Sequence, residues 1–406
     1  MQLDTVIFGG GAAGLWLLDE LVRREHSVVL LEAADLGQGQ TVAAQGIIHG
    51  GLKYTLQGLL TASAARIRTM PGIWRDCLAG RRLPDLSDVQ IRSQCCYLWR
   101  TESLTSRLGM IGAKFGLHVV PVTLSRSQRP PILASCPGTV ARLDEQVIAP
   151  DSLIAALFAK HSDRILKIDA QHGLEFEADA PGQVTAIRLA DTDGESNLEL
   201  RPKFVVFAAG TGNEKLRECV GLAKAEMQRR PLHMVMARGS LPQFNGHCVD
   251  GSKTRITVTS DTDTCGRTVW QFGGQIAEDG VDWDQSTLIQ RARAEITTVL
   301  PGIDLADVEW TTYRVDRAER TMTAGKRPET VQWIEEGNCI SAWPTKLAFV
   351  PELAGELSRH LPPHDATTHF DLDLIAGWPR PQVAKPPWEN ATGWQAVPEV
   401  TRKRAA

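Results

Sequence analysis

The first 32 residues hold a glycine-rich turn between two apolar runs, and this feature limits the possible folds more than any other. The runs TVIF and VVLL occupy positions 5–8 and 28–31. Glycines 9, 11 and 14 follow the G-x-G-x-x-G spacing, which is typical of a dinucleotide site when it links a strand to a helix. We expect Gly9 to allow the tight turn, Gly11 to let a pyrophosphate approach the backbone, and Gly14 to let the helix pack closely on the strands.

The start of this helix and the acid after the second apolar run complete the predicted nucleotide site. Free N–H groups and the positive end of the helix dipole, around Ala12 and Ala13, would hold phosphate groups. Glu32 lies eighteen residues after Gly14, where a carboxylate accepts hydrogen bonds from a ribose, and Ala33 follows it. This combination predicts dinucleotide binding, which a lone glycine motif would not.

Length, charge and composition exclude several other classes of protein. A chain of 406 residues is long enough for two domains with a large core. The net charge of −4 with no long basic block argues against nucleic acid as a partner. The sequence shows no signal peptide and no apolar run long enough to span a membrane. We therefore expect a cytoplasmic protein without a transmembrane segment, while peripheral membrane association stays open.

The cysteines and histidines show no spacing typical of disulfide or metal chemistry. Eight cysteines without a C-x-x-C pair are expected to be reduced thiols. Ten histidines form no H-x-x-x-H or H-E-x-x-H cluster, so the sequence does not indicate a metal site.

A segment of small residues, GQGQTVAAQGIIHGGLKY at positions 37–54, follows the βαβ unit. Small residues at this density suggest a backbone pressed against a flat partner. An ordinary glycine loop would also explain the composition, but the position directly after the βαβ unit favours a loop that runs along the cofactor. The expected cofactor contacts in this segment are Gln40, Thr41, Gln45, Gly46, His49 and Gly50.

The glycine turn and Glu32, taken with AAQGIIHGGLKY at 43–54, resemble the flavin-dependent glycerol-3-phosphate dehydrogenases. More broadly, they resemble the D-amino-acid oxidase superfamily of FAD enzymes. The resemblance implies FAD as the cofactor and an α/β (α+β) fold. In that fold a Rossmann-like FAD-binding domain carries a second, mostly antiparallel β substrate domain.

Three later stretches agree with the resemblance. Residues 147–157 resemble the turn and helix that return the chain to the FAD domain of that family. FVVFAAG at 204–210 resembles its apolar strand ending in small residues beside the FAD. Residues 325–328 and 340–347 resemble the closing loop and helix at the pyrimidine end of the flavin. Trp343-Pro344 stands where the family usually has glycines.

The resemblance and the strand patterns divide the chain into two domains and a tail. The FAD-binding domain is expected to be discontinuous and to comprise residues 1–75, 145–225 and 310–360. The substrate domain is expected to comprise residues 76–144 and 226–309. A Pro/Trp-rich tail, 361–406, is expected to wrap over the body, with only its last residues loose. Strand-like runs at 165–168, 174–178, 184–189 and 198–207 predict a small antiparallel addition to the FAD domain, and 285–299 predicts a helix.

The resemblance also implies contacts at the flavin end of the cofactor, from Ala209, Gly210, Lys346 and Leu347. Lys346 matches a family lysine near the flavin, where a cation would stabilise the negative charge of the reduced ring. The sequence has no second G-x-G-x-x-G, so a dedicated NAD(P)H domain is not predicted. The substrate itself would then reduce the flavin, and electrons would pass to oxygen, a quinone or a carrier protein.

Candidate catalytic residues follow from the same resemblance. An active-site Arg-Tyr pair of the glycerol-phosphate enzymes corresponds here to Lys53 and Tyr54, and Lys53 keeps the charge but loses the bidentate fork of arginine. Arg327 matches the family arginine that meets the substrate anion. His49 and His233 are candidate proton acceptors, because a neutral imidazole near pH 7 suits removal of an alcohol or ammonium proton. In some branches a histidine near this loop carries the flavin covalently, which makes His49 a candidate for that role too.

Three arginines recur at intervals of three, at positions 314, 317 and 320. In a helix they would form one stripe, and the acids at 316 and 319 would offset its charge. We interpret the set as surface ion pairs in preference to anion ligands.

Together these features predict an FAD-dependent oxidoreductase that oxidises a small anionic substrate at a CH–OH carbon by hydride transfer to flavin N5. Oxidation of an amine or amino acid at a CH–NH carbon is the alternative, weighed slightly lower because IIHGGLKY is closer to the glycerol-phosphate enzymes. A hypothesis of another class is an FAD-bound subunit with little activity alone, for which the tail would be a docking strap. A plain NAD-binding dehydrogenase is the remaining alternative, and a homo-oligomer stays open.

Overall fold

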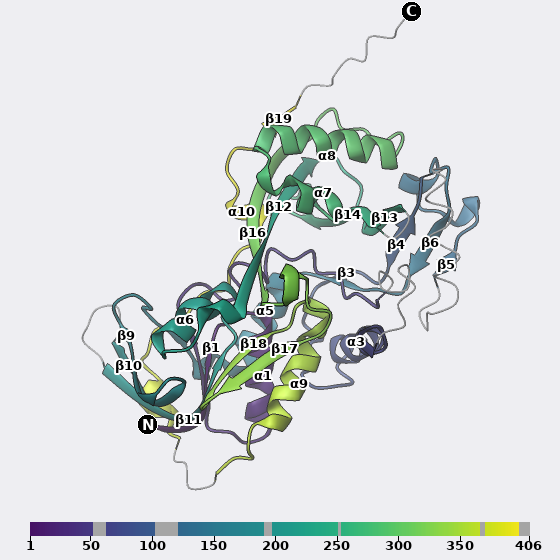
Figure 1. Cartoon of the computed structure of the whole chain (residues 1–406). Coiled ribbons are helices and arrows are strands. Elements are labelled where there is room, and N and C mark those ends of the chain that lie inside the picture. Colours follow the sequence, from purple (N-terminus) through teal and green to yellow (C-terminus); the bar gives the residue numbers. More distant parts are fainter. Residues whose placement is uncertain (52–61, 102–120, 191–196, 251–252, 366–369, 398–406) are drawn as a thin grey trace, which may run out of the picture.

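The computed structural model describes residues 1–51, 62–101, 121–190, 197–250, 253–365 and 370–397 (Figure 1). These residues form two large sheets and a small two-stranded one. Figure 1 shows the first large sheet with α1 and α9 in the lower half of the view, and the second with α8 across it in the upper half. Among the described helices, none is both long and apolar enough to cross a membrane.

The first sheet has strand β1 (Gln2–Phe8) at its centre. β1 pairs in parallel with β2 (Val28–Glu32) and with β11 (Asn197–Phe207), as the predicted βαβ unit requires. Every residue of β1 after its first is buried, because a parallel strand is covered on both faces and needs a continuous apolar run. The order of the sheet is β17 (Gln332–Glu336), β18 (Cys339–Trp343), β11, β1, β2 and β8 (Ile165–Lys167).

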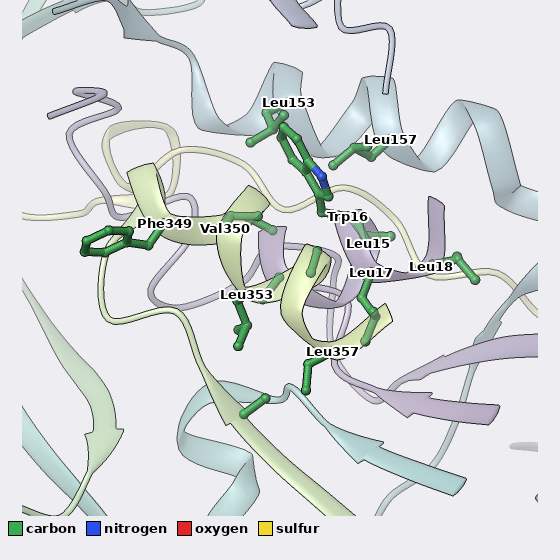
Figure 2. Close-up of a cluster of buried hydrophobic side chains, with 14 of the residues drawn as sticks. Leu15, Trp16, Leu17, Leu18, Leu153, Leu157, Phe349, Val350, Leu353 and Leu357 are labelled. Carbon is green, nitrogen blue, oxygen red and sulfur yellow. The ribbon is translucent and has the colours of Figure 1, made fainter. Parts of the chain in front are cut away.

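Four helices pack together beside the first sheet: α1 (Ala12–Arg23), α3 (Ala62–Leu78), α5 (Pro150–His161) and α9 (Val350–His360). Trp16 of α1 lies beside Leu153 and Leu157 of α5 (Figure 2). On its other side the Trp16 ring meets Trp74 of α3 edge to face, with centroids 4.9 Å apart. Burying aliphatic side chains of this size contributes about 1.5–3 kcal/mol each to folding, so this apolar layer holds α1 and its N-terminus in place.

The second sheet is mostly antiparallel and has two long strands, β12 (Met227–Gly239) and β16 (Glu309–Arg320). These pair from Met227 opposite Arg320 to Arg238 opposite Glu309. The order of the sheet is β19 (Gln395–Ala396), β16, β12, β15 (Thr268–Gly273), β14 (Lys253–Thr262), β13 (Gly246–Asp250), β4 (Cys96–Trp99), β6 (Val140–Leu143) and β5 (Val122–Thr123).

Helix α8 (Gln285–Val299) covers this sheet and has the predicted bounds. Its N-terminus is capped by Asp284, whose carboxylate accepts a hydrogen bond from the Thr287 N–H at 2.8 Å. Its buried face packs on the sheet through Leu288, Ile289, Ala292, Ile296 and Val299. The remaining elements are β3 (Ile91–Ser93), β7 (Val147–Ile148), β9 (Leu174–Ala180), β10 (Gln183–Ala190), α6 (Asn213–Cys219), α7 (Gln275–Asp279) and α10 (Pro387–Asn390).

Two predicted boundaries differ from the observed pairing. The predicted FAD-domain range 310–360 begins inside β16, yet β16 pairs with β12 along its whole length and so belongs to the second sheet. Of the four strand-like runs between 165 and 207, only β9, β10 and the first half of β11 form the antiparallel addition. β8 pairs in parallel with β2, and the second half of β11 continues beside β1.

The described part of the tail crosses from the first sheet to the second, as the predicted wrapping requires. The Trp378 indole donates a hydrogen bond to the carbonyl of Lys167 at 2.8 Å. The backbone of Leu36, at the end of the βαβ unit, bonds to residues 382 and 384. Trp388 is buried against Met236 of β12, and β19 then pairs with β16. The predicted loose end, residues 398–406, lies outside the described residues.

Replacing Trp378 with alanine is expected to lower the free energy of unfolding by about 3 kcal/mol or more, because a buried indole leaves a large cavity. Urea denaturation followed by circular dichroism measures this change. Leu374→Ala, in the same short segment, is the control, since that leucine is 64% exposed. Equal midpoints for the two variants would show that the tail does not stabilise the body.

Candidate functional site

The glycine turn has no room for side chains at two of its three motif positions. A Cβ on Gly9, whose φ is +108°, would lie 2.5 Å from the Cα of Ala209. A Cβ on Gly14 would lie 1.9 Å from the Gly9 carbonyl oxygen. A Cβ on Gly11 would lie 3.2 Å from the Thr41 Oγ1, a tight contact that a side-chain shift could relieve. Ala209 and Gly210, predicted from the resemblance, therefore lie beside the turn.

The carboxylate of Glu32 is held at the end of β2. It accepts hydrogen bonds from the backbone N–H groups of Gly10 at 2.5 Å and Ala34 at 2.7 Å. Ala33, another predicted contact, lies between Glu32 and Ala34 in the chain. Each carboxylate oxygen has a second acceptor site, which leaves capacity for a ribose hydroxyl. Beside it, the Ala12 N–H at the start of α1 points to the Thr41 hydroxyl at 3.3 Å.

The small-residue segment runs from this turn into a cavity of about 530 Å³ between the two sheets. The segment forms one wall, and the other walls come from β12, β14, β15 and β16 and from the loops around 327 and 346. Among the predicted residues the lining includes Gln40, Gln45, Gly46, His49, Arg327, Lys346 and Leu347. Lys53 and Tyr54 lie outside the described residues.

Three side-chain contacts fasten the segment to the second sheet. The Gln45 amide donates to the Gln271 carbonyl at 3.0 Å and to the Thr259 hydroxyl at 3.2 Å. The Tyr313 hydroxyl donates to the Ala43 carbonyl at 2.9 Å. The amide nitrogen of Gln45, which we predicted as a cofactor contact, is thus bonded to the second sheet. Gln40 is tied in the same way, because its Oε1 accepts from the Ala318 N–H at 3.1 Å.

At one end of the cavity a buried carboxylate lies between two imidazoles. Glu145 Oε2 is 3.6 Å from His49 Nδ1 and 3.9 Å from His247 Nε2, and Glu145 Oε1 accepts from the Gly50 N–H at 2.6 Å. Burial opposes ionisation of Glu145, but the hydrogen bond and charge of His49, the charge of His247 and the Gly50 N–H outweigh it and lower its pKa. The three side chains could also enclose a metal ion.

At the other end two arginines pair with a second buried carboxylate, and a third arginine lies near them. Glu319 is fully buried, 2.8 Å from Arg230 Nε and 3.8 Å from Arg327 Nε. Arg317 pairs with Glu278 at 3.2 Å. Burial and the neighbouring guanidinium groups of Arg230 and Arg327 lower the pKa of Arg317, so positive charge is crowded here. All three arginines line the cavity.

Of the arginines 314, 317 and 320, interpreted as surface ion pairs, Arg317 pairs with Glu278 and the arginine at 320 pairs with the acid at 226. The segment is strand β16, not a helix, so neighbouring positions point to opposite faces. Val315 and Arg317 face the cavity. Arg314 donates instead to the carbonyls of Val281 and Trp283 on the other face.

The structure does not bring His233 into the cavity. Its neighbours in β12, Leu232 and Met234, line the cavity, so the strand alternation turns His233 to the opposite face. There its Nδ1 lies 3.1 Å from the Gly280 carbonyl, and burial lowers the pKa of the imidazole.

Residues 4–333 match the family model described as DAO, FAD dependent oxidoreductase. The chain belongs to this family. A probable FAD-dependent oxidoreductase of Pseudomonas aeruginosa, PA4991, is 38% identical over 96% of this chain and 98% of its own length. The crystal structure of PA4991 superposes with a TM-score of 0.78, at 35% identity and with the same coverage of both chains. The predicted superfamily, fold class and FAD cofactor are thereby confirmed.

Two more distant relatives differ in the reaction that their names state. Glycerol-3-phosphate dehydrogenase 1 of Mycobacterium tuberculosis is 26% identical over 51% of this chain, which is 42% of that protein. Glycine oxidase of Geobacillus kaustophilus has a TM-score of 0.62 at 16% identity and covers 91% of this chain and 96% of its own. Both likenesses agree with the fold, and neither assigns a substrate.

The residues of the glycine turn fit the FAD that the family binds. Ala12 and Ala13 stand in the first turn of α1, and N–H groups at the N-terminus of a helix are suited to a pyrophosphate. The fixed carboxylate of Glu32 suits the adenosine ribose. The small-residue segment then leads from this end to the cavity.

Gly14→Ala is expected to abolish FAD binding, because a Cβ 1.9 Å from the Gly9 carbonyl forces α1 away from β1. The flavin content of the purified protein, read from its absorbance near 450 nm, measures the loss. Gly72→Ala in α3 is the matched control, since nothing lies within 4 Å of its Cβ. A folded Gly14→Ala protein with full flavin content would contradict the assignment.

Proposed function

We propose that this FAD-dependent oxidoreductase oxidises a small anionic substrate at a CH–OH carbon, and that its electrons pass on to oxygen, a quinone or a carrier. The observation that carries the proposal is the polarity of one cavity. Its imidazole end can accept a proton, and its arginine end can hold an anion. When bound, FAD supplies the hydride acceptor at flavin N5.

The arginine end would bind a carboxylate or phosphate. Arginine presents planar, paired N–H donors that match these anions. Both described contacts of the Arg327 guanidinium are long. Its Nε lies 3.8 Å from Glu319, and one terminal nitrogen donates to the Thr345 carbonyl at 3.4 Å. Arg317 faces the cavity beside it and pairs with Glu278 at the rim. We therefore assign Arg327 and Arg317 to the anion, with Lys53 and Tyr54 as further candidates from the sequence.

The imidazole of His49 would accept the proton of the substrate hydroxyl. The side chain lines the cavity and is 43% exposed, so a substrate can reach it. Its Nδ1 faces Glu145, which leaves Nε2 for the proton. Lys346 also lines the cavity and would supply a cation to stabilise the negative charge of the reduced flavin. We leave His233 out of the reaction, because its imidazole faces away from the cavity.

Oxidation of an amine or amino acid is the second candidate. The glycine oxidase of Geobacillus kaustophilus shares the fold over 91% of this chain, and the same two ends of the cavity would suit a carboxylate and an amine. The glycerol-3-phosphate dehydrogenase match rests on sequence, with 26% identity, and favours the hydroxyl substrate. A docking role for the tail has less support, since Trp378 and Trp388 are buried on this chain itself.

Anaerobic mixing of the purified holoenzyme with two panels decides between these reactions. One panel holds 2-hydroxy acids and glycerol phosphates, and the other holds amino acids and small amines. Bleaching of the flavin absorbance by a hydroxy anion is the expected result. Bleaching by amino acids alone would replace the proposal with its alternative, and a dye acceptor then shows whether the isolated chain turns over.

Arg317→Gln is expected to lower kcat/KM for the anionic substrate about 10- to 100-fold, because a hydrogen bond to a charged group contributes about 1.5–3 kcal/mol. Most of the loss should appear in KM, measured by steady-state kinetics with a dye acceptor. Arg314→Gln is the matched control, since that arginine lies on the same strand but on the opposite face. Equal effects of the two variants would remove Arg317 from the anion site.

A further inference from the structure

Three separate segments of the chain meet at the buried carboxylate of Glu145. The loop at 46–50 comes from the first domain, Glu145 precedes β7, and His247 lies on β13 of the second sheet. Glu145 is 3% exposed. A carboxylate buried to this degree is costly unless donors surround it, so its partners define what it does.

The backbone sets the positions of all three groups. Ile48 donates to the Gln146 carbonyl at 2.9 Å, and Ile148 donates to the Gly46 carbonyl at 3.0 Å. This short pairing places His49 directly beside Glu145. On the other side, β13 pairs with β14 so that His247 lies opposite Thr257.

The hydrogen bonds around the cluster orient its atoms. The Thr257 hydroxyl is 2.9 Å from His247 Nδ1, so His247 Nε2 is the nitrogen that faces Glu145 at 3.9 Å. The Gly50 N–H holds Glu145 Oε1 at 2.6 Å, and Oε2 is turned to His49 Nδ1 at 3.6 Å. The two imidazole rings are 5.5 Å apart between centroids. Apo distances of this kind tighten when charge forms on the base.

We propose that Glu145 is a positioning residue that acts through His49, and that His247 shares the same carboxylate. Glu145 holds His49 with Nδ1–H toward the carboxylate, so that Nε2 faces the cavity as the proton acceptor. This inference rests on the proposed function. The substrate O–H bond would break as its proton forms an N–H bond at His49 Nε2, and bound FAD would supply the acceptor for the hydride of the C–H bond. The substrate loses two electrons and becomes a carbonyl compound.

Glu145 would act in two ways. It selects the tautomer of His49 that can accept the proton, which is the part played by a carboxylate behind a catalytic imidazole. It also supplies the negative charge that stabilises the imidazolium once the proton has moved. His247 Nε2 faces the same carboxylate at 3.9 Å, so a second imidazole nitrogen lies beside Glu145.

The described titratable groups around this pair are few. Glu145 faces His49 and His247, and the Cys96 thiol of β4 is buried nearby, where burial and the charge of Glu145 raise its pKa. Cys96 itself belongs to an apolar cluster with Ile47 and Val249.

The test compares Glu145→Gln with the wild-type holoenzyme. Glutamine keeps the shape and removes the charge. We expect kcat/KM for the substrate to fall on the order of 100-fold. Most of the loss should appear in kcat, because His49 would spend less time in the tautomer that accepts the proton. Glu145→Asp should restore part of the rate, and Thr257→Val should leave the Nδ1–H tautomer of His49 in place.

A readout independent of turnover separates this proposal from the proposed function. In histidine-labelled protein, the NMR shifts of the ring nitrogens should show the Nδ1–H tautomer of His49 in the wild type and a mixture of tautomers in Glu145→Gln, whichever substrate the enzyme takes. An unchanged tautomer in a folded, flavin-loaded variant would overturn the proposal. So would one equivalent of a transition metal in the purified wild type that is lost in Glu145→Gln, since the cluster would then be a metal site. Failure of both substrate panels with the expected NMR shift would overturn the proposed function alone.

Discussion

The fastening of the segment 37–51 between the two sheets is the constraint on which the rest of the structure depends. One end of the segment lies beside the glycine turn. There Gly9 and Gly14, which have no side chain, let α1 lie against β1. On the other side Gln45 and Tyr313 bond it to the second sheet. A buried, multiply bonded side chain has little freedom, so the segment carries the geometry of the first domain into the cavity. The cavity would have no fixed wall without it.

Both ends of the cavity contain a buried carboxylate beside nitrogen bases, but the bases differ in their chemistry. Each has a carboxylate buried between two nitrogen bases, Glu145 between imidazoles and Glu319 between guanidinium groups. The guanidinium groups keep their charge at every physiological pH, so that end attracts anions permanently. Imidazole is the side chain best suited to accept and release a proton, so that end can take part in proton transfer. The difference in chemistry lies in the bases, since the carboxylates are alike.

The sequence could predict the parts of the site that local chemistry determines. The glycine turn is such a part, because the strand, turn and helix are contiguous and the spacing itself states the geometry. The pairing of Glu145 with His49 and His247 is not, since the three lie about a hundred residues apart and share no motif. Arg317 and His233 show a third case. Successive side chains of a strand point to opposite faces of the sheet, so whether each residue faces the cavity depends on its exact position along the strand. A shift of one residue would turn the side chain to the other face. Recognising β16 as a strand would have separated Arg317 from Arg314.

The tail explains why the second sheet can be positioned firmly on a first sheet that it meets along few strands. Residues 382 and 384 bond to Leu36, just beyond Glu32, and the chain then continues to Trp388 and β19 on the second sheet. Arg92, nearly fully buried and paired with Asp261 of β14, lies over the Trp388 ring at 5.3 Å. A cation stacked on an indole away from water contributes about 2 kcal/mol. The tail therefore links the segment after Glu32 to the sheet that carries the arginines, and it adds to the contacts that Gln45 and Tyr313 make.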